Sequence, residues 1–184
     1  LSGNNTFTSG LTIKAGTVLG TVSATAFGSG GSITLGDSAG GSNAATLLVG
    51  TTGLTIARPI ALASTTTGTP SIGNSNDIAA LTFSGGVTGT NDLTINNTST
   101  GASTIALTVG AVNNTGKITN VGTSTGATTI STVGGVGGNV TEIIENSTTS
   151  ALTVSAPVTT TGSKTFRNAS GGALLTISGA VSGT

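Results

Sequence analysis

A three-residue pattern of apolar residue, threonine and apolar residue recurs along the chain. It places apolar side chains at positions i and i+2 with a polar one between them, which is the period of a β-strand that buries one face. Seven copies are complete, and an eighth, Thr128-Thr129-Ile130, keeps only its last apolar position. The copies begin at residues 11, 33, 54, 81, 107, 128, 152 and 175. The pattern predicts short β-strands throughout the chain.

The spacing of these copies predicts how the strands are arranged. Successive copies begin 21 to 27 residues apart, and clusters of Gly, Asn, Ser and Thr typical of turns lie between them. Residues 98–105 are repeated almost literally at residues 123–130, as expected if a coil-length unit was duplicated. An antiparallel sandwich would place its turns about every 8–12 residues. The longer interval favours a parallel β-solenoid, in which each repeat is one coil.

We therefore predict an all-β parallel β-helix of about eight coils of about 23 residues. We expect it to be a single domain over residues 1–184, and an excerpt or repeating unit of a longer or polymerised protein. The 35% of hydrophobic residues and the mean hydropathy of +0.35 are too high for a disordered chain. The side chains predicted to stack inward are Leu11, Ile13, Leu54, Ile56, Leu81, Phe83, Leu107, Val109, Leu152, Val154, Leu175 and Ile177.

The amino-acid composition removes most of the chemistry that enzymes and metal sites use. The chain has no His, Cys, Met, Trp or Tyr, and its five basic residues balance five acidic ones. The usual general base, the thiol nucleophile and the soft metal ligands are therefore missing. Zero net charge offers no field to a nucleic acid or an anionic membrane, and no apolar run is long enough for a membrane helix. We expect no cofactor, no nucleic-acid partner and no membrane insertion.

The five acidic residues are the remaining candidates for catalysis, because some β-helix proteins cleave sugars with paired carboxylates. Glu142 and Glu145 are close enough in sequence to face one groove, but their apolar neighbours are typical of ordinary strand edges. Asp37, Asp77 and Asp92 adjoin Gly or Asn, where a turn carboxylate accepts hydrogen bonds from backbone amides. We expect no catalytic residue, and a carbohydrate-active β-helix remains an alternative that depends on Glu142 or Glu145.

The glycine-rich and basic segments give no stronger functional signal. Residues 134–139 lack the acidic side chains of calcium-binding solenoid turns, so we expect no metal site beyond an adventitious ion near an Asp. Residues 164–167 place Lys164 and Arg167 beside Phe166. We interpret this segment as a solvated strand with the phenyl ring inward, and a small sugar-binding patch is the alternative.

Thr-x-Thr steps raise ice binding as a further alternative, since flat threonine arrays on β-solenoids resemble the faces of antifreeze proteins. Such steps occur at residues 6–8, 88–90, 98–100, 123–125 and 159–161, and the central Thr of each three-residue pattern adds another file. Against this reading, coils that vary between 21 and 27 residues suit a regular lattice poorly. Ordinary outward threonine ladders are also favoured by β propensity and by cross-strand contacts.

The start of the chain carries a more specific motif. Asn5-Thr6-Phe7-Thr8-Ser9-Gly10 is followed by Thr12-Ile13-Lys14-Ala15-Gly16-Thr17-Val18-Leu19. With Ser9 where a second Gly is common, residues 1–19 resemble the autotransporter-associated β-strand repeat, in which an N-T-aromatic-T-G segment precedes T-[IV]-x-x-G-T-L. Such repeats occur in large bacterial passenger proteins displayed at the cell surface. The resemblance implies a right-handed parallel β-helix.

These observations together predict a secreted structural protein that is not an enzyme. Neither end of the sequence carries the charge or proline run that would cap a strand edge. We therefore expect a stiff rod, fibre or filament at the cell surface, built by stacking coils end to end on copies of the chain or on adjoining coils of a longer one. The alternatives are an adhesin passenger segment that binds host or glycan surfaces, and an ice-binding solenoid.

Overall fold

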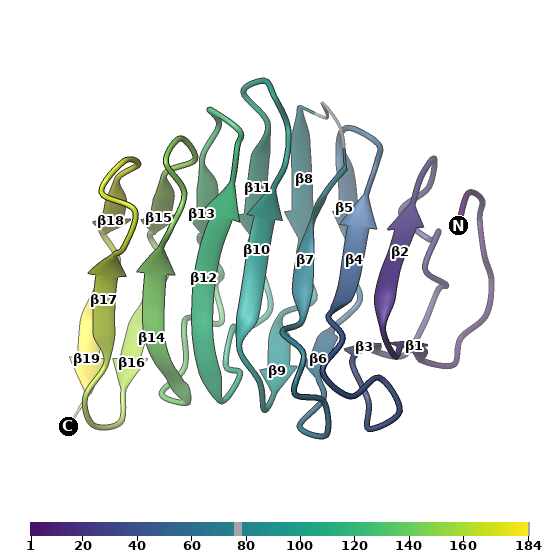
Figure 1. The fold of residues 1–184 in the computed structure, drawn as a ribbon, viewed down its shortest axis with the longest axis horizontal. Helices are drawn as coiled ribbons and strands as arrows, with labels where there is room; N and C mark the ends of the chain where they lie inside the picture. Colours follow the sequence, from purple (N-terminus) through teal and green to yellow (C-terminus); the bar gives the residue numbers. More distant parts are fainter. Residues whose placement is uncertain (76–78, 184) are drawn as a thin grey trace.

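The computed structural model describes residues 1–75 and 79–183. These residues form nineteen strands, all paired in parallel, and no helix that could cross a membrane occurs among them. The strands lie on three sides of a flattened rod, which we name the front, back and lower sheets as they appear in Figure 1. The prediction of an all-β parallel solenoid is confirmed.

The front sheet is the longest, with seven strands along the rod. It consists of β2 (Gly16–Gly20), β4 (Ala45–Val49), β7 (Ser71–Asn74), β10 (Leu93–Asn97), β12 (Gly116–Gly122), β14 (Val140–Glu145) and β17 (Thr165–Asn168). The back sheet has six strands, which are β5 (Leu54–Ile56), β8 (Ala80–Phe83), β11 (Thr104–Leu107), β13 (Thr128–Ile130), β15 (Leu152–Val154) and β18 (Leu175–Ile177).

The lower sheet is less regular, because its middle narrows to single-residue bridges. Its strands are β1 (Leu11–Ile13), β3 (Ile33–Leu35), β6 (Ile60–Leu62), β9 (Val87–Gly89), β16 (Val158–Thr160) and β19 (Val181–Gly183). Between β9 and β16, Val112 and Val136 continue the ladder as parallel bridges. Both valines are fully buried, so the apolar stack is unbroken where the strands are interrupted.

The chain winds in one direction from end to end. In Figure 1 it rises along each front strand, crosses the top, descends along the back sheet and moves from right to left with every turn, which is a right-handed winding. There are about seven turns of about 24 residues. The predicted handedness is therefore correct, and the predicted number of coils was one too many.

The miscount arises because the three-residue pattern serves two different sheets. Leu11 and Ile33 pair with each other in the lower sheet, whereas Leu54 pairs with Leu81 in the back sheet. The eight copies therefore form two ladders instead of one. A strand on either side of a three-sided coil needs the same alternation, since each buries one face against the same core.

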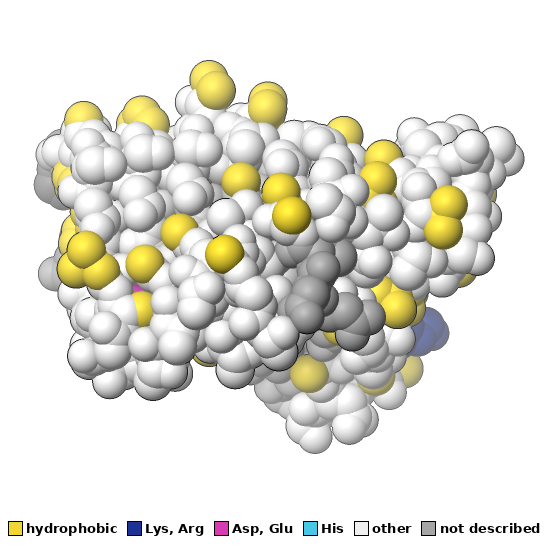
Figure 2. Space-filling model, turned by 90° about the horizontal axis from the view of Figure 1, so that it is seen from above, with side chains coloured by type: hydrophobic (Ala, Val, Ile, Leu, Met, Phe, Trp, Pro, Cys, Tyr) yellow, Lys and Arg dark blue, Asp and Glu magenta, His cyan; other side chains and the backbone are white. Residues whose placement is uncertain are grey.

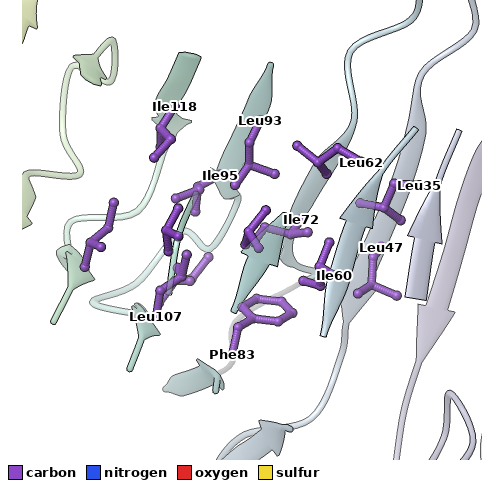
Figure 3. Packing of buried hydrophobic residues seen from close by; sticks show 14 of the residues in the cluster. Leu35, Leu47, Ile60, Leu62, Ile72, Phe83, Leu93, Ile95, Leu107 and Ile118 are labelled. Carbon is purple, nitrogen blue, oxygen red and sulfur yellow. The ribbon is translucent and has the colours of Figure 1, made fainter. Parts of the chain in front are cut away.

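Side chains from all three sheets meet along the axis of the rod, as Figure 3 shows for Leu47, Ile60, Leu107 and their neighbours. Eleven of the twelve predicted inward residues lie in this core or pack against it. Val109 is the exception, with 59% of its surface exposed. The ladder uses Ile105 and Leu107 against Leu81 and Phe83, which pushes Val109 beyond the strand and into the corner.

Differences in coil length are absorbed in the corners between sheets. Leu54 and its ladder partner Leu81 are 27 residues apart, while Ile105 follows Leu81 by 24 and Leu152 follows Thr128 by 24. The back sheet nevertheless keeps its register from β5 to β18. The strands are thus more regular than the sequence intervals suggest.

The first coil departs from the others at the back of the rod. Residues 21–32 form no back strand there; instead they run beside residues 1–10, with Ser2 bridged to Thr21 and the Ser29 amide donating to the Phe7 carbonyl at 2.9 Å. Phe27 fills the interior at this level and is 1% exposed. A Cβ on Gly20 would lie 2.2 Å from the Phe27 ring, so this glycine leaves the space that the ring occupies.

Candidate functional surfaces

The two acidic residues closest in sequence lie on opposite sides of β14. Glu142 points outward, where its carboxylate meets Lys117 Nζ at 3.1 Å and Arg167 Nε at 2.7 Å. Glu145 points inward and is completely buried. Side chains three residues apart on a strand point to opposite faces, because successive side chains alternate between faces. Glu142 and Glu145 therefore do not share a groove.

The other acidic residues that the structure describes hold turns. Asp37 Oδ1 accepts a hydrogen bond from the Gly40 amide at 2.9 Å, and its other oxygen lies 3.3 Å from Lys14 Nζ. Asp92 Oδ1 accepts one from the Lys117 amide at 2.8 Å. Asp77 lies outside the described residues. Within residues 1–75 and 79–183, no three acidic side chains come together as a metal site would need.

The surroundings of Glu142 and Glu145 shift the pKa values of the two side chains in opposite directions. Hydrogen bonds from Arg167 and then Lys117 hold the pKa of Glu142 below its ordinary value. Burial raises the pKa of Glu145, and hydrogen bonds from Asn120 and the Ser147 amide only partly offset this. A raised pKa in a cleft is a common sign of a catalytic acid, but Glu145 has no exposed surface to offer a substrate.

Glu145 belongs to a buried polar ladder in the corner between the front and back sheets. Asn74 donates from Nδ2 to Asn97 Oδ1 at 2.9 Å, and Asn120 donates from Nδ2 to Glu145 Oε2 at 2.9 Å. The serine hydroxyl of Ser147 donates to the carbonyl of Gly122 in the preceding coil. Asn97 and Asn120 also donate to the backbone carbonyls of Ser103 and Ser150, so side chains satisfy backbone groups of the turn where no ladder continues. Figure 2 looks onto this corner from above and shows almost no charged side chain on its surface.

The basic segment near the C-terminus is structural as well. Lys164 Nζ donates to the carbonyl oxygens of Gly137 and Val140 in the preceding coil. Arg167 pairs with Glu142. Phe166 is in register with the buried Ile143, as expected for a ring that points inward. These contacts agree with the solvated-strand interpretation of residues 164–167.

Arg58 has a structural role that the sequence did not indicate. Its guanidinium donates to the carbonyl oxygens of Phe27, Gly31, Ser32 and Ser9. It is 7% exposed and lies over the Phe7 ring at 5.8 Å from the centroid. Burial lowers the pKa of this group. A lone arginine before a proline looks like any surface charge, so only the fold reveals these partners.

The Thr-x-Thr steps do not combine into one surface. Residues 98–100 and 123–125 lie in the corner between the front and back sheets, and their hydroxyl groups bind the protein itself: Thr98 Oγ1 donates to the Asn74 carbonyl at 2.7 Å and Thr123 Oγ1 to the Thr98 carbonyl at 3.3 Å. Residues 88–90 and 159–161 belong to the lower sheet, on either side of its interruption. The Thr-x-Thr steps are thus dispersed, whereas the central threonines of the three-residue pattern in the back sheet share one column.

A regular hydroxyl-bearing surface does exist on the outward side of the back sheet. We call it the hydroxyl face and define it by two columns of outward residues. The first column is Thr55, Thr82, Ala106, Thr129, Thr153 and Thr176. The second, two residues further along each strand, is Ala57, Ser84, Thr108, Ser131, Ser155 and Ser178. A four-residue pattern of apolar, Thr, apolar and Ser, as in residues 175–178, was the signal for it.

The C-terminal end of the rod leaves its core uncovered. Leu175 and Ile177 face inward but are only half-buried, and Phe166 is 37% exposed although its ladder neighbour Ile143 is completely buried. Strands β17 and β18 each have a ladder partner on one side only within the described residues. We call this surface the open end. It presents apolar side chains and unpaired strand edges together.

No known protein family, curated protein or solved structure matches the chain. Because no family model matches, the resemblance of residues 1–19 to autotransporter repeats supports a proposal and not an assignment. What is established is the architecture, a parallel β-solenoid of about seven turns compatible with a structural or repeat scaffold.

Proposed function

We propose that the chain is a structural scaffold, a stiff rod that lengthens when a further coil stacks on its open end. The single observation that carries this proposal is the uncovered core of the last coil. Apolar side chains that face the axis lose solvent only if another coil covers them. Each unpaired strand edge also needs hydrogen-bond partners, and a parallel coil supplies them.

The stacking partner is a second copy of the chain or an adjoining coil of a longer one. Strand β1 at the opposite end presents a lower-sheet edge, the same kind of edge as β19 at the open end. The end of β2 is covered by the first residues, since the Leu1 amino group donates to the Leu19 carbonyl and the Thr21 amide donates to the Leu1 carbonyl, so a stacking copy would have to displace Leu1 and Ser2 there. Zero formal net charge means that little long-range repulsion opposes association of two copies. A heterologous contact of this kind repeats without closing and produces a filament.

We place this rod outside the cell and assign it no catalytic role. The similarity of residues 1–19 to repeats of surface-displayed passengers supports the location. The carboxylates that the structure describes are engaged in turns, in surface ion pairs or in the buried ladder, and this supports a structural role. Binding of a cell-surface glycan remains compatible with the same rod.

Electron microscopy and sedimentation of the purified chain test the proposal. We expect filaments with a diffraction spacing of about 4.7–4.9 Å along their length. Ile177→Lys should leave single short rods, because stacking would bury an ammonium group at the centre of the interface. Thr176→Lys is the matched control, since the adjacent side chain points outward and should leave filaments intact.

Two results would overturn the stacking of copies. One is a wild-type chain that stays monomeric at high concentration, which would leave adjoining coils of a longer chain as the cover. The other is an Ile177→Lys variant that forms filaments as readily as Thr176→Lys. Circular dichroism of both variants establishes that each still folds, so loss of filaments is not confused with loss of the solenoid.

A further inference from the structure

We propose that the hydroxyl face of the back sheet binds ice. This inference concerns a side of the rod and does not depend on what stacks at its ends. The ligand is the ordered water of an ice-crystal surface. Three properties of the face support it: its regularity, the free state of its hydroxyl groups and its lack of charge.

Regularity comes from the unbroken ladder of the back sheet. All six strands are in register, so the central column of Thr55, Thr82, Ala106, Thr129, Thr153 and Thr176 repeats at the spacing of parallel strands, about 4.8 Å. The serine column lies about 6.6 Å away along the strands, twice the rise per residue. The corners absorb the variation in coil length, which removes the objection that coils of unequal length cannot match a lattice.

The second column continues the ladder beyond the ends of the strands. Backbone amides of Ser84, Ser131, Ser155 and Ser178 donate to the carbonyl groups of Ile56, Leu107, Ile130 and Val154 in the preceding coils, at 2.9 to 3.0 Å. Their side chains are therefore spaced by the same hydrogen-bonded backbone as the threonines. Two parallel files of small side chains result, and threonine adds stiffness because its branched Cβ restricts rotation.

The hydroxyl groups of this face are available to a ligand. In the part of the chain that the structure describes, no side-chain hydrogen bond is found for Thr82, Thr129, Thr153 or Ser155, all of which are at least partly exposed. The corner hydroxyls behave differently: Ser124 and Ser150 are buried and donate to backbone carbonyls. A free hydroxyl can both donate and accept a hydrogen bond, as an ice lattice requires.

Charge distinguishes this face from the front sheet. Neither column contains a charged residue, whereas the outward side of the front sheet carries Lys117, Glu142 and Arg167. Charged groups hold their own hydration water and disturb a neutral lattice, while methyl and hydroxyl groups in regular rows do not. The ligand that fits is neutral, periodic and rich in hydrogen-bonding groups.

Crystalline polysaccharide shares those three properties and is the competing ligand. Sugar rings bind flat surfaces largely by packing on aromatic side chains. Phe83 is the aromatic residue of the described back-sheet strands, and it faces the core at 3% exposure. Small side chains alone give such a ligand little contact, so the observations favour ice.

Ala106 allows the most direct experiment, because it interrupts the first column, whose other five residues are threonine. We expect the wild-type chain to show thermal hysteresis and to shape ice crystals, and Ala106→Thr to increase the hysteresis gap at equal concentration. A defect in folding cannot produce such a gain. Wild-type protein that neither shapes ice nor enters polycrystalline ice would overturn the proposal.

A matched pair of substitutions tests which face is responsible. Thr129→Lys places a charge in the middle of the hydroxyl face and should lose most of the thermal hysteresis. Thr94→Lys places the same charge on the outward side of the front sheet and should retain it. Equal loss in both variants, or retention by the chain on microcrystalline cellulose or chitin without any effect on ice, would also contradict ice binding by this face.

Discussion

Thr128 places a hydroxyl group where its ladder neighbours place aliphatic carbon. It lies between Ile105 and Leu152 in the inward column of the back sheet and is completely buried. No hydrogen-bond partner is found for its Oγ1 among the described residues. A buried hydroxyl without a partner costs free energy because it has lost water and gained nothing in return.

Thr128→Val should therefore stabilise the rod. Valine has nearly the same shape, so the substitution removes the unpartnered oxygen without opening a cavity, and we expect a gain of about 1–2 kcal/mol in the free energy of unfolding. Urea denaturation followed by circular dichroism measures it. Thr129→Val, the same change at the adjacent outward position, is the control and should alter stability little; a gain at residue 129 but not at 128 would contradict the inward placement.

At the scale of elements, buried polar side chains bridge two pairs of front strands where they end, β7 with β10 and β12 with β14. Asn74 and Asn97 do so with amide groups, which can donate and accept without charge. Glu145 lies in the neighbouring inward column, in register with Asn120 and Ile95, and brings a buried carboxylate into this corner. Ionisation of that carboxylate is disfavoured, because the charge cannot be solvated by water.

The stability of the rod should consequently depend on pH through Glu145. Burial raises its pKa in the folded state above the ordinary 4.5, so its contribution is fully present below that ordinary value and is lost as the pH rises through the raised one. Glu145→Gln should be more stable than wild type at neutral pH and should show less change with pH. Thermal melting from about pH 4, just below the ordinary pKa, to about pH 8 measures this.

Glu142→Gln provides the opposite control for that experiment. The pKa of Glu142 is lowered by Arg167 and Lys117, so its contribution is present above the ordinary value and is lost as the pH falls through the lowered one. The variant should be slightly less stable than wild type at neutral pH. If Glu145→Gln also lowered stability there, the carboxylate would have to be stabilised by its neighbours more than it is destabilised by burial.

The strands were predictable from the sequence, but their assignment to sheets was not. Alternation of apolar residues and threonine identified β1, β3, β5, β8, β15 and β18 correctly. The segment from Ile105 to Val109 has apolar residues at three alternate positions, so two registers fit the pattern equally well. Pairing with β8 decides between them, and that is a contact between residues far apart in sequence. The first column of the hydroxyl face was predicted as the file of central threonines, but its second column was missed, since it becomes visible only when coils are aligned by register.

At the scale of the whole molecule, each coil is stabilised mainly by the coils directly above and below it. The stability of such a rod is close to a sum of nearest-neighbour terms. At the N-terminal end, Arg58 adds hydrogen bonds that connect several segments, because it donates to carbonyl groups of Ser9 and of the segment from Phe27 to Ser32. Loss of this residue should affect those coils first.

Arg58→Ala should loosen the first coils without melting the rest. We expect a loss of about 2–4 kcal/mol in local stability, because four carbonyl groups lose a charged donor at a site closed to water. Hydrogen exchange should become faster in residues 1–35 and remain unchanged in β12 to β18. Arg58→Lys should recover little, since an ammonium group lacks the planar fork of a guanidinium. Equal acceleration along the whole rod would contradict a local role.

The near-literal duplication of residues 98–105 at 123–130 acquires a meaning from the register of the back sheet. The copies lie in consecutive coils, but the sheet pairs Ile105 with Thr128 and Leu107 with Ile130, two residues out of step with the duplication, which aligns Ile105 with Ile130. A shift of two residues keeps every side chain on its own face of the sheet. A gene encoding such a rod can gain or lose coils by unequal recombination while every junction still meets a compatible neighbour. The number of coils, and with it the length of the rod, can then change quickly under selection without any new fold.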